Sequence, residues 1–336
     1  GDMVISQRNG TSSSTVPKTG SAQYHLDRWS TQAASLDEAA IVAAQVTDAP
    51  DGFGHSMKFT VNTPESVVNA NEYLSLYQKM EGQDFQQLKY GTSGAKTITM
   101  SFWVKSSITG TFSFTIYRDE STDRIVNKTY TINSANTWER KTITIAGDTS
   151  SAITDDNGAR WWNVWHLGAG SDYTSVTSST WANYSTTNWA GGQGTNAVLT
   201  TNGATWAVTG VQLEVGSEAT PFEHISYNQQ LARCQRYYYL AASGATSGSS
   251  NRSPICTTCN YNASYSFGVV YFGVRMRSSP TISSTEGTNY YRIFSDGGSD
   301  LFDNVSLQSS SPEAYCIQFY GNLSRTAGQG SWAETE

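Results

Sequence analysis

Short runs in which apolar and polar residues alternate recur along most of this chain, and they constrain its fold more than any other feature. Ile98, Met100 and Phe102 share one face of a run that ends shortly before Gly110, and residues 111–117 alternate again. This two-residue period is typical of strands that bury one face, and a glycine between two such runs indicates a hairpin. Only 15% of the residues are charged, and Ser, Thr and Gly are abundant. The pattern therefore predicts an all-β chain.

The stretch 206–223 marks a junction between two domains. Four of its apolar residues are spaced to line one face of a strand: Val208, Val211, Leu213 and Val215. Gly216 and Pro221 follow and are expected to end this strand. Further on, apolar residues return at helical spacing, so a short helix is expected next; they are Leu231, Cys234 and Tyr238.

The same junction carries a resemblance to a known family. Residues 208–223, which run Val-Thr-Gly-Val-Gln-Leu-Glu-Val-Gly-Ser-Glu-Ala-Thr-Pro-Phe-Glu, and residues 229–238 resemble a segment of bacteriophage tail-fibre and related virion proteins. The segments 24–29, 81–117 and 274–282 are similar to the same proteins. In that family the segment closes a jelly-roll domain similar to carbohydrate-binding modules, so the resemblance implies this fold here.

Length and pattern together predict two domains, because 336 residues exceed what one ordinary domain needs. We expect a jelly-roll β-sandwich similar to carbohydrate-binding modules over 1–226. A second, smaller β-sandwich over 227–336 would follow it, joined by the short helix. Residues 240–260 are rich in Ser, Gly and Thr and are expected to form a loop. The strands expected after it are 265–274, 290–294, 304–307 and 313–320, and the first of these is apolar on both faces, which favours a central strand.

The net charge and the lack of a long apolar run argue against two classes of partner, nucleic acids and membranes. The net charge is −7 and no basic run is present, which argues against nucleic-acid binding because that binding depends on Lys and Arg neutralising phosphates. The sequence has no run of about 18 apolar residues, so no membrane insertion is expected.

The most aromatic stretch, 160–170, supplies the candidate binding residues. Trp161 and Trp165 fall on one face of the expected strand and Trp162 on the other. One row must face the core, and the other either is exposed, where sugar rings could stack on it, or lies beneath the long polar loop 171–201. The candidate carbohydrate-binding residues are Trp161, Trp165, Tyr173, Trp181 and Trp189.

Catalytic and metal sites receive less support. His166 stands alone and is interpreted as a structural imidazole, since neither a nucleophile elbow nor a His-rich metal pattern accompanies it. Two acidic pairs, Asp119-Glu120 and Asp155-Asp156, fall where turns are expected. They are interpreted as solvated turn charges, and a structural calcium is the alternative.

The four cysteines lie in the last third of the chain. Cys256 and Cys259 have the spacing of a zinc knuckle, but a second close pair is absent from the sequence. Buried free thiols, or at most one disulfide, are therefore favoured over a metal site. Cys234 is expected in the core, because it falls on the apolar helix face.

The resemblance implies a non-enzymatic virion protein, most simply a tail fibre or receptor-binding component that contacts host cell-surface glycans. A head fibre or capsid decoration protein is one alternative. A polysaccharide depolymerase is another, although the sequence places no pair of carboxylates for it. The implied location is the tail or capsid surface of the virion, and the implied partners are other virion proteins and further copies of the chain in a homotrimer. A trimer would also account for 10 Trp and 19 Tyr, since interfaces favour these residues.

Overall fold

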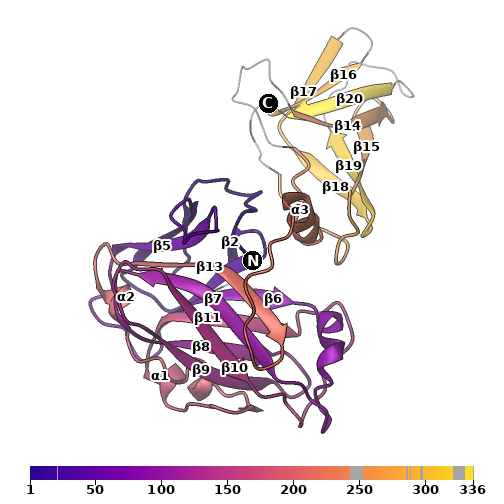
Figure 1. Cartoon of the computed structure of the whole chain (residues 1–336). Coiled ribbons are helices and arrows are strands. Elements are labelled where there is room, and N and C mark those ends of the chain that lie inside the picture. The colour runs from indigo at the N-terminus through magenta and orange to yellow at the C-terminus, as the bar shows by residue number, and fades with distance from the viewer. Residues whose placement is uncertain are drawn as a thin grey trace. The chain divides into compact units, whose positions relative to one another are not determined.

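The computed structural model describes residues 1–20, 22–242, 253–284, 287, 289–295, 298–320 and 330–335. The chain divides into two compact units, an N-terminal unit Gly1–Tyr227 and a C-terminal unit Asn228–Glu336. Each is built mainly from antiparallel strands, so the all-β prediction is confirmed (Figure 1). Among the described residues, no helix is long and apolar enough to cross a bilayer.

Two sheets stack face to face in the N-terminal unit. Sheet A has six strands, in the order β1 (Ser14–Thr15), β4 (Ala40–Val46), β5 (Ser56–Thr63), β13 (Thr205–Val215), β7 (Ile98–Ser106) and β10 (Glu139–Ile145). Sheet B has seven, in the order β12 (Ala182–Asn183), β9 (Arg124–Ile132), β8 (Gly110–Arg118), β11 (Trp161–Ala169), β6 (Tyr73–Met80), β3 (Trp29–Ala34) and β2 (Gln23–Leu26). Neighbours in a sheet are often distant in sequence, as β13 between β5 and β7 shows, which is the connectivity of a jelly roll.

The core of the N-terminal unit lies between the two sheets and is rich in aromatic rings. Trp165 on β11 is fully buried, and its ring centroid lies 5.7 Å from Phe102, 5.0 Å from Phe114 and 5.6 Å from Trp29. Phe102 belongs to sheet A, whereas Trp165 and Phe114 belong to sheet B. The rings therefore join the two layers, and each aromatic contact adds a directional preference to the area it buries.

The strand at the junction, β13, keeps its apolar face only because it contains a bulge. The register against β7 shifts between Thr209 and Gln212, and this extra residue brings Val208 and Val211 to the same side. The bulge contains Gly210 at φ +60°, where a Cβ atom would lie 2.8 Å from the ring of Phe53. The shared face predicted for this strand is thus confirmed at Val208 and Val211, which are buried. Leu213 and Val215 lie opposite the core residues Met100 and Ile98 and so share that face, although Val215, at the end of the strand, is 49% exposed.

The segment 171–201 consists of short helices and one short strand rather than an open loop. It contains α1 (Ser171–Thr174), β12, η2 (Thr186–Asn188) and α2 (Ala197–Thr200), and it lies on the outer face of sheet B. Ser113 donates to the Gly191 carbonyl at 2.8 Å, and Thr115 donates to the Trp189 carbonyl at 3.2 Å. The remaining helical piece of this unit is η1 (Gly82–Leu88).

The C-terminal unit begins at α3 (Tyr227–Gln235), which confirms the predicted helix and buries Cys234 as expected. Its single sheet C has seven strands, in the order β17 (Gly298–Phe302), β16 (Tyr291–Ser295), β20 (Gly330–Thr335), β14 (Ser253–Asn260), β15 (Tyr265–Tyr271), β19 (Ala314–Tyr320) and β18 (Val305–Ser310). The ring centroids of Phe302 on β17 and Phe319 on β19 lie 6.2 Å apart, although four strands, β16, β20, β14 and β15, lie between β17 and β19 in the sheet. The sheet therefore curls over itself, and its two halves enclose a small core.

Part of the loop predicted for 240–260 is a strand. Residues 253–260 form β14, which pairs with both β15 and β20, because its Thr and Cys residues suit a pleated surface. Residues 243–252 of that predicted loop lie outside the described residues.

Candidate functional site

Three of the five predicted carbohydrate-binding residues are core residues. Trp161 and Trp165 are 0% exposed and Trp189 is 6% exposed. The first two lie on the face of β11 that meets sheet A, and Trp161 is stacked on Phe85 at 4.5 Å. No face of these rings is open to a sugar, so their assignment as a binding platform is corrected: Trp161 and Trp165 pack between the two sheets, and Trp189 packs on Tyr77 and Tyr117 on the outer face of sheet B.

Trp181 and Tyr173 are half-buried, and both pack on the protein itself. The Trp181 indole donates to the Ala146 carbonyl at 2.8 Å, and its ring lies 5.7 Å from Tyr90. Tyr173 makes an edge contact with Tyr73 at 4.8 Å. The structure does not bring the five predicted residues together at one surface, and only these two keep the prediction of a binding role.

A different row of rings runs across the outer face of sheet B. We call Tyr77, Trp162, Tyr117 and Tyr184 the aromatic strip. Ring centroids along it lie 5.9, 4.9 and 5.2 Å apart in that order. The first three stand on neighbouring strands, since Trp162 on β11 pairs with Tyr117 on β8 and Val164 pairs with Tyr77 on β6. Tyr77 and Tyr117 are buried at its base, whereas Trp162 is half-buried and Tyr184 is 37% exposed.

Polar groups border the strip. The Lys79 ammonium lies 3.6 Å from the centre of the Trp162 ring, a cation–π contact, and burial lowers the pKa of Lys79. The Tyr77 hydroxyl donates to Gln32 at 2.9 Å, which leaves the Gln32 amide nitrogen as a donor. Aromatic rings flanked by a few amide, ammonium and carboxylate groups are the usual composition of a ligand site.

Two carboxylates lie at the Tyr117 end of the strip. The Tyr117 hydroxyl donates to Asp123 at 2.6 Å. Burial, and secondarily the negative charge of Asp123, raise the pKa of Asp119 above its usual value. The sequence interpreted Asp119 as a solvated turn charge, whereas the structure places it half-buried beside a second acid.

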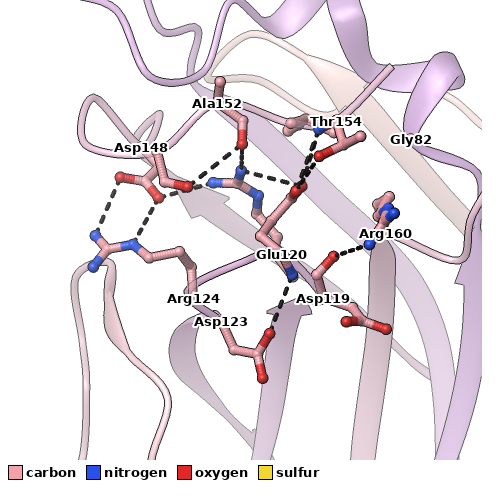
Figure 2. Close-up of polar contacts among 12 residues, drawn as sticks. Gly82, Asp119, Glu120, Asp123, Arg124, Asp148, Ala152, Thr154 and Arg160 are labelled. Carbon is pink, nitrogen blue, oxygen red and sulfur yellow. Dashed lines mark hydrogen bonds and ion pairs between the residues drawn. The ribbon is translucent and has the colours of Figure 1, made fainter. Parts of the chain in front are cut away.

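A buried ion network supports this end of the sheet (Figure 2). Arg118 and Arg124 both bind Asp148, through Arg118 Nη1 at 2.8 Å and Arg124 Nε at 3.0 Å. Arg118 also donates to the Ala152 carbonyl at 2.6 Å, and its cation lies 5.7 Å from the Trp181 ring. The network ties β8 and β9 to the loop that carries Asp148, and it fixes the strand ends on which the acids of the strip stand.

One acid of each pair considered for calcium forms an ion pair with an arginine. Glu120 lies 3.6 Å from Arg118 and accepts from the Thr154 hydroxyl at 2.7 Å (Figure 2). Asp156 pairs with Arg160 at 2.7 Å. With a side chain only 4% exposed, Glu120 is not the solvated charge that was predicted. The carboxylate oxygens of Glu120 and Asp156 therefore already contact arginines.

One other acidic group lies elsewhere on the N-terminal unit. Among the described residues, Asp37, Glu38 and Glu65 bring carboxylate oxygens within 4.8 Å of one another. Glu65 is buried and accepts from the Ala39 amide at 2.9 Å. Oxygen ligands are those that calcium prefers. These three carboxylates could hold such an ion.

His166 is a structural residue, as predicted. It is 0% exposed, with Nδ1 2.7 Å from Ser75 Oγ and Nε2 3.1 Å from Thr115 Oγ1. Burial lowers its pKa to about 3, so the ring is neutral near pH 7.

Cys256 and Cys259 are not arranged as a zinc knuckle. Both belong to β14, and residues three apart on a strand point to opposite faces. Burial also raises the pKa of the Cys256 thiol to about 11, so the thiol is protonated near pH 7. All four cysteines are free.

The sequence named neither Trp162 nor its neighbours as binding residues, although it placed Trp162 on the opposite row from Trp161 and Trp165. One signal was present: the row of Trp162 also carries His166, whereas the other row continues with Leu167. Tyr77 and Tyr117 come from separate strands, and only their pairing with β11 brings them together.

No protein-family model matches the chain, and no curated protein matches it either. Among solved structures, it is similar to the enzymatically active domain of bacteriophage CBA120 tailspike protein 4 (14% identity, TM-score 0.32), with 56% of this chain and 20% of that chain covered. It is also similar to the family 11 carbohydrate-binding module of Clostridium thermocellum Lic26A-Cel5E (12% identity, TM-score 0.30, 63% and 99% covered). The CBM22-1 xylan-binding domain of Paenibacillus barcinonensis Xyn10C is a third case (11% identity, TM-score 0.30, 61% and 100% covered). No residue role is taken from these likenesses.

Proposed function

We propose that this chain is a non-enzymatic phage virion protein, a tail fibre or receptor-binding component, whose N-terminal unit binds host-surface glycans along the aromatic strip. The observation that carries the binding proposal is the strip itself, in which half-buried Trp162 and exposed Tyr184 are held in line by buried Tyr77 and Tyr117. Sugar rings pack their C–H faces on aromatic rings, while amide and carboxylate groups bind hydroxyls. The virion role is supported by the sequence segments that resemble tail-fibre proteins.

The polar border gives the strip a way to orient a sugar. Lys79 now lies on the face of Trp162. A sugar ring that packs on this face takes the place of the ammonium, which then donates to a hydroxyl. At the Tyr77 end of the strip the Gln32 amide adds a hydrogen-bond donor for a sugar hydroxyl, and at the Tyr117 end Asp123 adds an acceptor.

Titration calorimetry with host surface polysaccharide tests the binding site. We expect Trp162→Ala and Tyr184→Ala each to weaken binding at least tenfold, or about 1.4 kcal/mol, because each removes a ring that remains at the surface. Trp138→Ala is the matched control. Trp138 is also half-buried, but its indole donates to Asp48 beside sheet A. Unchanged affinity in both strip variants, with the fold intact by circular dichroism, would refute this site.

Asp119 and Asp123 favour a second candidate, a polysaccharide depolymerase. A carboxyl with a raised pKa beside a second carboxylate is the pattern of an acid and its partner in glycoside hydrolysis. Incubation of the protein with host polysaccharide, followed by an assay for reducing ends, separates the two. Release that Asp119→Asn or Asp123→Asn abolishes would establish the enzyme. Binding without release would support the non-enzymatic proposal.

The proposal extends to assembly and location. We propose a homotrimer attached to other virion proteins on the tail, with the capsid surface as the alternative location. Immunogold labelling of intact particles with an antibody to this chain distinguishes the two places. Label confined to the capsid would overturn the tail assignment and leave glycan binding to its own test.

A further inference from the structure

A row of tyrosines covers the outer face of sheet C. We call this row the tyrosine stripe; it consists of Tyr261, Tyr265, Val269, Tyr271 and Tyr320. Its central members lie on β15, with Tyr261 before that strand and Tyr320 on β19. Tyr265 lies directly opposite Tyr320 in the sheet. The exposed fractions in the stripe are 68% at Tyr261, 38% at Tyr265, 45% at Val269, 75% at Tyr271 and 47% at Tyr320.

The stripe is an open face of a central strand, not an unpaired edge. β15 pairs with β14 on one side and with β19 on the other, so both of its hydrogen-bonding edges are used. Its inward residues Ser266 and Val270 are buried. The sequence predicted a strand with two apolar faces, and only the inner one is covered within the C-terminal unit. The outer face therefore has apolar side chains that this unit does not bury.

The exposed area is what one side of a stable interface requires. At roughly 200 Å² for each aromatic side chain, the exposed fractions together amount to about 500 Å² of largely apolar surface. A standard interface buries about 800 Å² per partner, and about 65% of that is apolar between identical subunits. The exposed apolar area of the stripe is therefore close to the apolar share of such an interface, and it lies at the upper limit of the apolar patch area that monomers usually expose.

The charge of the stripe suits a second copy of the same surface. The outward positions of β15 and β19 carry no ionisable acid or base apart from the tyrosine hydroxyls and Cys316; the other β19 residues of this face are Ala314, Gln318 and Tyr320. A charged face would repel its own copy, whereas a neutral face of Tyr, Val and Gln would not. Glu313, next to β19, pairs with Arg275 at 3.2 Å.

We propose that the tyrosine stripe is the surface through which the C-terminal unit packs on a second copy of this chain. The proposal rests on the self-assembly contained in the proposed function, and it names the residues responsible. Tyrosine suits this role, because it contributes a large contact area with few rotatable bonds and is enriched at interface hot spots.

Sedimentation of the full chain tests the stripe. One chain has a mass of 36.6 kDa, and the wild type is expected to sediment as a multiple of that mass. The double variant Val269→Lys/Tyr271→Lys is expected to sediment at 36.6 kDa, or to associate at least tenfold more weakly, because it buries two charges at the contact. Both side chains are exposed, so the fold should remain intact, which thermal unfolding checks. The matched control is Leu301→Lys, at a 42% exposed apolar residue on β17, and it should keep the wild-type mass.

Three results would overturn the proposal, and they differ in what else they overturn. A wild-type chain that stays at 36.6 kDa up to high concentration removes both the proposed assembly and the stripe as its surface. An assembled wild type whose mass the double variant keeps removes the stripe alone. A double variant that keeps its mass but loses glycan binding shows that the stripe faces sugar instead of a second copy.

Discussion

The two units of this chain treat their aromatic residues in opposite ways. The N-terminal unit completely buries the largest rings between its two sheets, with Trp161, Trp165 and Trp206 at 0% exposure, whereas the C-terminal unit leaves Tyr271 75% and Tyr261 68% exposed. Two stacked sheets present two inner faces to each other, so rings from both layers are enclosed. One curled sheet has a single inside, and the rings on its outer face stay open. The difference shows that sheet stacking, and not aromatic content, decides which rings are available to a partner.

The two units also differ in how far they bury their charged and titratable groups. The N-terminal unit buries an ion network around Asp148 and two histidines, His25 and His166. The C-terminal sequence contains no histidine, and its pair Arg275–Glu313 has side chains that are 71% and 58% exposed. Stability of the first unit should therefore respond strongly to core substitutions and to pH, and stability of the second should respond weakly.

Removal of the Trp165 ring should give the largest effect. Trp165→Ala is expected to lower the unfolding free energy of the N-terminal unit by about 3–5 kcal/mol, since it leaves a cavity among Phe102, Phe114 and Trp29. Urea unfolding followed by tryptophan fluorescence measures it. Tyr271→Ala in the C-terminal unit is the counterpart and should change the stability of a single chain by no more than about 0.5 kcal/mol. Equal losses in the two variants would break the comparison.

The buried ion network should give the next effect. Asp148→Ala leaves Arg118 and Arg124 without their shared carboxylate and should cost about 3 kcal/mol, because an uncompensated buried charge is expensive. Thermal unfolding of the full chain is the measurement. Glu313→Ala, which breaks an exposed pair, should cost less than about 1 kcal/mol. A mild loss in Asp148→Ala would mean that water reaches the two guanidinium groups.

Acid should destabilise the N-terminal unit by a smaller amount. Burial lowers the pKa of His25 to about 4 and that of His166 to about 3, both below the ordinary value of 6.5. Between those values the unfolded chain binds protons that the folded chain does not, so stability falls as the pH drops below 6.5. From pH 6.5 to 5.5 the loss should be about 1 kcal/mol for each histidine.

Calorimetric scans at the two pH values measure this loss. The transition of the C-terminal unit is the internal control, since that unit has no histidine. A double variant His25→Gln/His166→Gln should lose the pH step in this range even where its stability is lower throughout. A step that persists in the double variant would assign it to other groups.

Much of the local structure could be predicted from the sequence, because strand periodicity depends on neighbouring residues. The strands β7 and β8, the helix α3 with Cys234 inside, and the strand β19 follow directly from alternation or helical spacing. The hairpin predicted for residues 98–117 was wrong, because β7 belongs to sheet A and β8 to sheet B, and the two strands do not pair. The bulge at Gly210 also leaves a trace in the odd spacing of Val208 and Val211. The candidate site was not predictable in the same way, because Tyr77, Trp162 and Tyr117 are neighbours only across strands.

The sequence by itself determined that this chain is all-β, that its strands have apolar rows, and that one row of β11 must be buried. Only the tertiary structure decided which row that is. A two-residue period is the same for both faces of a strand, so the choice depends on the side where the second sheet packs. In β11 the second sheet packs on the side of Trp161 and Trp165 and leaves Trp162 outside. In β15, which is apolar on both faces, no second layer among the described residues of its unit covers the tyrosines.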